Sequence, residues 1–356
     1  MKKIVLILSV AALALASCVK TSDVYTGSPD SRQITFAPLA QRMTKSGMVS
    51  DNVFPTAYNF YLAAYSVDGS NHDYFDKTEY ANEATTTIWS GASTKRYWPL
   101  AEETLNFLAV TKQGTTQSVT FGDNTPANYA SKVVVELSDN RPNSGVQYDL
   151  MYSFARAAVT KNGNGLSYNG GNNVSMAFAH AQSWVNFTVK AGNTATAAAN
   201  LVVTGIQLKG AAYDGTATIT LSNYDSKSVD LSAAVAWDGT AYGNATKHDV
   251  NVPGISSVAV NDDTNVIPCG DGLMVVPNPN ETNSVLNPSF GSFVVSYTLA
   301  GKPYSFEYTP SAAQRALQPG HKYNFDITFT LHEIKVDASV TSWTTGDGIA
   351  VGIPSV

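Results

Sequence analysis

The chain has 356 residues with a formal net charge of −6, and only 14% of its residues are charged while 44% are hydrophobic. An average soluble protein has about 25% charged residues, so this composition is typical of a β-rich extracellular protein and not of a helical cytosolic enzyme. The hydrophobic fraction excludes an intrinsically disordered chain, the scattered basic residues exclude a phosphate-binding nucleic-acid surface, and the length predicts about two domains.

The amino-terminal residues have the organisation of a bacterial export signal. Lys2 and Lys3 precede an apolar stretch at residues 4–15, which has the length of a signal-peptide core and is too short to span a bilayer. It ends in Leu-Ala-Ser-Cys at residues 15–18, which resembles the lipobox of bacterial lipoproteins, where the cysteine takes a lipid and the chain is cut before it. The alternative is an ordinary signal peptide with a chance cysteine.

We therefore predict a lipoprotein signal peptide at residues 1–17, lipidation of Cys18, and an acylated tether at residues 18–32. Cys269 is the one other cysteine, so no intrachain disulfide is then available. No other segment has 18 continuous apolar residues, so we expect the lipid to be the only membrane attachment.

From residue 34 onward, apolar and polar residues alternate with a period of two, which is the pattern of half-buried strands. Phe60, Leu62 and Ala64 share one face of such a run, and residues 323–331 (YNFDITFTL) alternate throughout. Residues 106–110 (NFLAV) are more continuously apolar, which predicts a strand buried on both faces. With turn-forming Gly, Asn and Asp between the runs, the pattern predicts an all-β sandwich fold, with one short helical turn at residues 312–317 that Ser311 caps.

The richest turn-forming stretch, at residues 162–173, has the sequence NGNGLSYNGGNN. The strand pattern begins again at residue 176. We therefore predict an N-terminal domain at residues 33–175 and a C-terminal domain at residues 176–356.

No catalytic or metal-binding pattern is present in the sequence. The five histidines are far apart, and the chain lacks zinc-binding spacings, an EF-hand loop, a phosphate-binding loop and a nucleophile elbow. We expect no enzyme activity, no metal site and no cofactor. The five tryptophans would suit a sugar-stacking platform, although such residues more often fill a sandwich core; they are Trp89, Trp98, Trp184, Trp237 and Trp343.

The two ends of the exported chain carry the most informative pattern. Residues 34–39 (ITFAPL) predict a short strand, and a polar basic loop of the kind that proteases cut follows at residues 41–47. Residues 349–356 (IAVGIPSV) follow a Gly-rich hinge and again alternate large apolar with small residues. Such a terminal strand either pairs at the edge of its own domain or adds to a groove of another molecule.

Motifs along nearly the whole chain resemble those of the fimbrillin family, the type V pilins and pilin-like lipoproteins of Bacteroidales-type bacteria. Besides the lipobox, the matching segments are ITFAPLAQR (34–42), YWPL (97–100), LNFLAV (105–110), YDLMYS (148–153), FAHAQSWVNFTVKA (178–191), VVP (275–277) and QPGHKYNFDITFTLHEIKVDASVTSW (318–343). Each motif alone is loose, but their order and spacing together are distinctive.

The resemblance implies two tandem transthyretin-like β-sandwich domains with very little helix. It also implies a fimbrial subunit or pilin-like adhesin that is exported as an outer-membrane lipoprotein. In that family an arginine-specific protease cuts after the first strand, and the carboxyl-terminal strand of another subunit fills the groove that is opened.

By position, Arg42 is the implied cleavage site, with Arg32 and Lys45 as alternatives. The displaced first strand would contain Ile34, Phe36 and Leu39. The donor strand, at about residues 346–356, would present Ile349, Val351, Ile353 and Val356.

The implied partners are other pilin subunits, the membrane through Cys18, the protease, and a ligand on a host or bacterial surface, with no nucleic acid. The precursor would lie at the outer membrane and the mature subunit in a fimbrium. Stalk, tip and anchor roles stay open, and the alternative function is a surface glycan-binding lipoprotein that never polymerises.

Overall fold

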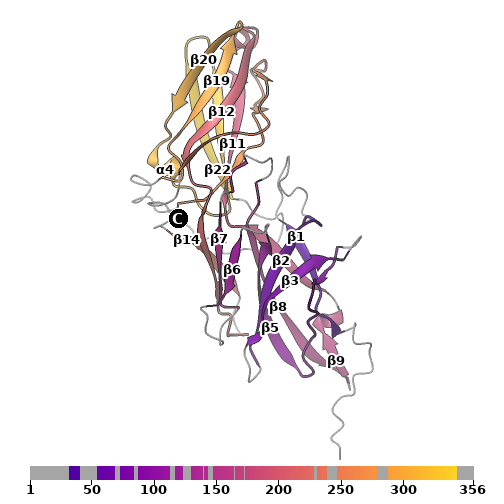
Figure 1. The fold of residues 1–356 in the computed structure, drawn as a ribbon. Coiled ribbons are helices and arrows are strands. Elements are labelled where there is room, and N and C mark those ends of the chain that lie inside the picture. The colour runs from indigo at the N-terminus through magenta and orange to yellow at the C-terminus, as the bar shows by residue number, and fades with distance from the viewer. Residues whose placement is uncertain are drawn as a thin grey trace, which may run out of the picture.

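The computed structural model describes residues 32–40, 54–68, 73–83, 87–112, 117–122, 130–138, 140–142, 147–163, 165–171, 173–227, 231–238, 247–278 and 288–342. This part of the chain is almost entirely β-structure, as predicted, and forms four sheets in an elongated molecule (Figure 1). Its helical elements are short: α1 (Thr194–Ala197), α4 (Ala312–Arg315) and the 3₁₀ turn η3 (Asn169–Gly171).

The predicted helical turn near residue 312 is confirmed as α4. The hydroxyl of Ser311 accepts a hydrogen bond from the backbone N–H of Gln314, and the side chain of Gln314 accepts one from the backbone N–H of Ser311 at 2.9 Å. This reciprocal capping box satisfies two amide groups that the start of a helix otherwise leaves unpaired.

The first sheet has eight strands: β1 (Phe36–Ala40), β2 (Asn59–Ser66), β3 (Asp73–Asn82), β4 (Trp89–Gly91), β5 (Glu103–Lys112), β8 (Met151–Asn162), β9 (Gly165–Tyr168) and β10 (Val174–His180). Their order is β10-β1-β4-β3-β2-β5-β8-β9, and β10 also pairs with β8. The extra pairing closes the sheet into a ring from β10 round to β8. Inside the ring lies an aromatic-rich core that contains Phe36, Phe60, Phe107 and Phe178.

A second sheet, in the order β14-β13-β7-β6, packs on the outside of this ring. It consists of β6 (Ser118–Phe121), β7 (Lys132–Leu137), β13 (Gly215–Ser222) and β14 (Ser232–Trp237). Its inner residues Val133 and Ile219 share a cluster with Ala63 of β2 and Leu108 of β5. Strand β5 is thus covered on both faces, which confirms the prediction for residues 106–110.

The other two sheets form a sandwich at the far end of the molecule (Figure 1). One has the order β17-β11-β21-β22 with β18 also paired to β11, and the other has the order β15-β12-β19-β20 with β16 also paired to β12. The strands are β11 (Ser183–Ala191), β12 (Leu201–Ala211), β15 (His248–Asn251), β16 (Val258–Ala259), β17 (Ile267–Pro268), β18 (Leu273–Val275), β19 (Ser292–Leu299), β20 (Lys302–Tyr308), β21 (His321–Phe329) and β22 (Ile334–Ser342).

The core of this sandwich brings Phe187 of β11 and Phe325 of β21 against Phe293 of β19, with ring centroids 5.0 and 5.3 Å from the Phe293 centroid. The predicted alternation within residues 323–329 is confirmed, because every second side chain is buried. Leu331 departs from it and is 47% exposed, since it follows the end of β21.

Residue 175 does not separate the first two sheets from the two sheets of the far sandwich. β10 (Val174–His180) belongs to the first sheet, and β13 pairs with β7 although β12 of the far sandwich precedes it in the chain. The stretch at residues 162–173 forms the β8–β9 hairpin and η3 within the first sheet. The two-domain division near residue 175 stays a prediction. Strand pairs join residues on the two sides of that boundary.

Cys269 lies in the core of the far sandwich with no exposed surface. Burial raises the pKa of its thiol to about 12. At about pH 8 only about one thiol in ten thousand is then ionised in the folded protein, and the thiolate is the reactive form. We expect a Cys18→Ser variant to react negligibly with a disulfide reagent when folded and to titrate one thiol in denaturant; rapid reaction of the folded protein would contradict the burial.

Candidate functional site

Strand β1 joins two strands that are remote in sequence. It runs parallel to β10 in the register from Phe36↔Val174 to Ala40↔Phe178, and on its other side it meets β4 only at Phe36↔Trp89. Most of the backbone pairing of β1 is thus with β10. If β1 left, the ring of the first sheet would open between β10 and β4.

The inward side of β1 is held by aromatic packing on Phe36, which has no exposed surface. The Phe36 ring makes edge-to-face contacts with Phe60, Tyr80 and Phe107, at centroid distances of 6.0, 4.9 and 5.3 Å. Each such pair adds to the free energy of simple burial. Phe36 is therefore the main anchor of the strand.

The residues just before β1 are also tied to the body of the domain. The backbone N–H of Ile34 donates to the carbonyl of Arg96 at 2.8 Å, and Gln33 forms an isolated antiparallel bridge with Tyr97. Ile34 is fully buried, as predicted for the first strand, although regular strand begins only at Phe36. Leu39 lies in β1 opposite Ala177.

The chain returns to the same core at Phe54. Its ring lies 4.5 Å from that of Phe178 and 5.4 Å from that of Trp89. Phe54 thus packs on Phe178 of β10 and on Trp89 of β4, the two neighbours of β1. A break in the chain between β1 and Phe54 would leave this anchor on the body of the protein.

A buried polar pair lies where β10 meets β8. The Nδ1 atom of His180 is 2.9 Å from the Oδ1 atom of Asp149, and both side chains are fully buried. This pair and the β10–β8 backbone pairing hold β10 on the body independently of β1. The two residues are far apart in sequence, so no local pattern indicated the pair.

Several predicted site residues lie outside the described residues, namely Cys18, Arg42, Lys45, Ile349, Val351, Ile353 and Val356. Arg42 follows Ala40, the last residue of β1, by two positions. The alternative Arg32 is described: its backbone carbonyl accepts a hydrogen bond from Trp98 at 2.9 Å, and its guanidinium carbon lies 5.9 Å from the centroid of the Tyr97 ring.

At the other end, the last described strand is β22. Among the described strands it pairs only with β21, and most of its side chains are exposed. The chain thus passes into residues 343–356 directly from β22, which lies at the edge of its sheet among the described strands.

The tryptophans resolve one alternative that the sequence left open. Four of them are buried, with exposed fractions of 1% (Trp89), 4% (Trp98), 3% (Trp184) and 7% (Trp237). These four belong to the packed interior and form no exposed stacking platform; Trp343 lies outside the described residues.

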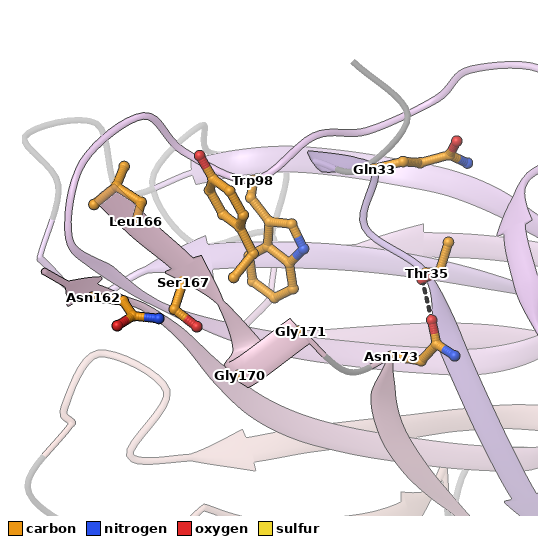
Figure 2. Close-up of a pocket in the computed structure, with 10 residues that line it drawn as sticks. Gln33, Thr35, Trp98, Asn162, Leu166, Ser167, Gly170, Gly171 and Asn173 are labelled. Carbon is orange, nitrogen blue, oxygen red and sulfur yellow. Dashed lines mark hydrogen bonds between the residues drawn. The ribbon is translucent and has the colours of Figure 1, made fainter. Parts of the chain in front are cut away.

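A cavity of about 450 Å³ opens beside the start of β1, which the sequence did not predict (Figure 2). Residues from three separate parts of the chain line it, among them Gln33, Thr35, Trp98, Asn162, Ser167 and Asn173. The turn-forming stretch at residues 162–173, which had predicted a domain boundary, forms part of the cavity wall.

Within the described part of the chain, no group of three or more His, Cys, Asp or Glu residues is placed to hold a metal ion. No helix there is both long and apolar enough to cross a membrane.

A family model described as fimbrillin-like matches residues 48–343 of the chain. No curated protein matches the sequence. Among solved structures, a fimbrial protein from Bacteroides vulgatus is 15% identical, with a TM-score of 0.52 over 88% of this chain and 100% of that chain. A fimbrial assembly protein from Parabacteroides distasonis is 8% identical, with a TM-score of 0.38 over 87% of this chain and 98% of that one. The fimbrial anchor protein Mfa2 from Porphyromonas gingivalis is 10% identical, with a TM-score of 0.34 over 88% and 98%.

Proposed function

This chain belongs to the fimbrillin-like family, and from that premise we propose that it is a fimbrial subunit or pilin-like adhesin that polymerises by strand exchange at the cell surface. In this proposal it is exported as an outer-membrane lipoprotein through Cys18. An arginine-specific protease then cuts at Arg42, and a neighbouring subunit supplies the replacement strand.

The observation that carries the proposal is the setting of β1. It is short and is the first strand of the described residues, its neighbours β10 and β4 are held by other contacts, and its first residue Phe36 fills an aromatic slot. Removing β1 would leave backbone N–H and C=O groups of β10 unpaired and would expose apolar surface to water. Both costs disappear when a new strand enters, which supplies the driving force for assembly.

The carboxyl-terminal segment has the pattern that this slot requires. Ile34, Phe36 and Pro38 are buried at a spacing of two in β1 and the residues before it, and Ile349, Val351 and Ile353 repeat this spacing in the sequence. In a strand, such residues point to one face. Pro354 cannot donate to a strand ladder, so the exchanged ladder is expected to involve mainly residues 349–353.

The experiment that tests the proposal treats the purified full-length protein with an arginine-specific protease. We expect the parent chain to lose its first strand, to expose a new amino terminus at Met43 and to form denaturant-resistant ladders. Arg42→Ala should keep the first strand and stay monomeric, because the cleavable bond beyond β1 is gone. Mass spectrometry of the amino terminus and gel electrophoresis without heating measure both results.

The matched control for this experiment is Arg32→Ala. Arg32 precedes β1, so a cut there would release the tether but leave the slot filled, and this variant should still assemble. An Arg42→Ala protein that loses its first strand and forms ladders would refute the assignment of the cleavage site. A parent chain that is cut, loses β1 and remains monomeric would refute polymerisation.

The second candidate is a glycan-binding surface lipoprotein that never polymerises, in which Ile34 and Phe36 stay buried in the uncut chain as they are here. The mature amino terminus on cells separates the two candidates. Acylated Cys18 on all of the surface protein supports the second candidate, and Met43 supports the first.

A further inference from the structure

The cavity beside β1 has the features of a ligand site. Its volume of about 450 Å³ lies within the range of roughly 300–1,000 Å³ that is usual for small-molecule sites. Figure 2 shows the indole of Trp98 between the side of Asn162 and Ser167 and the side of Thr35 and Asn173. Trp98 is largely buried, so the wall presents mainly polar groups on both sides of the indole.

The polar groups are neutral. None of the described residues that line the cavity carries a formal charge at neutral pH, and the whole stretch at residues 162–173 contains no Asp, Glu, Lys or Arg. Amide and hydroxyl side chains each supply both donors and acceptors. A phosphate or carboxylate would enter this site without a positive charge to balance it. A ligand hydroxyl group needs both a donor and an acceptor, and these side chains supply both.

We propose that this cavity binds a neutral saccharide, with Asn162, Ser167 and Asn173 as hydrogen-bonding groups. Leu166 and Tyr168, both half-buried, add apolar surface to the wall for the carbon-bound hydrogens of a sugar ring.

The polar wall is preorganised. The hydroxyl of Thr35 donates to the Oδ1 atom of Asn173, and the Nδ2 atom of Asn169 donates to the Asn173 carbonyl at 3.2 Å. Gly170 and Gly171 have φ angles of 64° and 82°, which a residue with a side chain rarely adopts. Little conformational freedom is therefore lost at Asn173 when a ligand binds.

The saccharide site is also linked to the first strand. Gln33 and Thr35 line it and lie on the segment that leads into β1, and the Thr35 carbonyl accepts a hydrogen bond from Val174 of β10 at 2.9 Å. A ligand that requires both walls stabilises the state in which both are present. If the proposed processing occurs, saccharide binding therefore opposes release of β1, and loss of β1 dismantles the site.

The test is calorimetric titration of the uncut full-length protein with lactose, maltose and N-acetyllactosamine, with glucose 6-phosphate as the charged comparison. We expect at least one neutral disaccharide to bind at least tenfold more tightly than the phosphate. Asn162→Ala should weaken its binding at least tenfold, and Thr35→Val should weaken it as well. Asn251→Ala is the matched control, since both asparagines are exposed and end a strand.

Three results would overturn the inference: no neutral disaccharide binds at millimolar concentration, the phosphate binds as tightly, or both pocket variants bind like the parent chain. Binding by the uncut protein does not depend on cleavage or polymerisation, so this result and the proposed function fail separately. Protein that has lost residues 1–42 should no longer bind; unchanged binding would refute the role of Gln33 and Thr35.

Discussion

Replacing Phe36 by alanine is expected to lower the free energy of unfolding of the uncut protein by about 3–5 kcal/mol, the usual cost of removing a fully buried phenylalanine ring. Phe36 has no exposed surface, and its ring contacts Phe60, Tyr80 and Phe107 inside the closed sheet. These three rings belong to strands that β1 itself does not hold in place. The space left by the missing Phe36 ring would therefore be filled only in part by movement of its neighbours. Urea denaturation followed by tryptophan fluorescence measures the change.

Tyr304→Ala is the control for this prediction. Tyr304 is 47% exposed on β20 and stacks on Tyr297 at 5.6 Å, so its removal should cost no more than about 1 kcal/mol. A Phe36→Ala variant that loses no more than the control would show that β1 is not anchored by its aromatic residue. Under the proposed function, the same variant should release β1 faster after cleavage.

Deleting residues 349–356 is expected to abolish polymerisation of the cleaved protein while it still folds. An open head-to-tail assembly needs every subunit to accept one strand and to donate one. The truncated subunit keeps the slot of β1 but lacks the donor, so it should accept a strand from an intact subunit and then end the chain. Light scattering and electron microscopy of the cleaved variant, alone and mixed with the parent protein, test this.

A pair of substitutions makes the same test without shortening the chain. Val351→Asp places a charge on the apolar face of the donor strand, where burial without a partner is costly, and should prevent assembly. Ala350→Asp places the same charge on the opposite face and should assemble. Normal fibres from the deletion or from Val351→Asp would refute the donor role.

Local features of the fold followed directly from the sequence. The alternation at residues 60–65 predicted that Phe60, Leu62 and Ala64 share one face, and these three side chains indeed lie together in the inner core while Ala63 and Tyr65 lie in the outer one. The apolar run at residues 106–110 predicted a strand that is buried on both faces. Such patterns are predictable because the side-chain period of a strand is two whatever its neighbours are.

The pairing of strands did not follow from the sequence. β1 lies beside β10, and β13 crosses back from the far sandwich to β7. The domain boundary predicted at residue 175 rested on turn composition, yet the Asn- and Gly-rich stretch forms a hairpin inside the first sheet. A hairpin and a linker between domains require the same turn-forming residues, so composition does not separate them.

The candidate site likewise has features that followed from the sequence and features that only the packed fold shows. Residue type and spacing alone predicted an all-β protein, alternating apolar residues at Ile34 and Phe36, and a second alternating apolar segment at residues 349–353. The packed fold was needed to show that β1 sits between β10 and β4 with Phe36 in a slot of three rings, and that a cavity lined by uncharged residues lies beside it. Backbone hydrogen bonds between strands are the same for every residue, so the identity of a strand's neighbours emerges only when all the strands pack together.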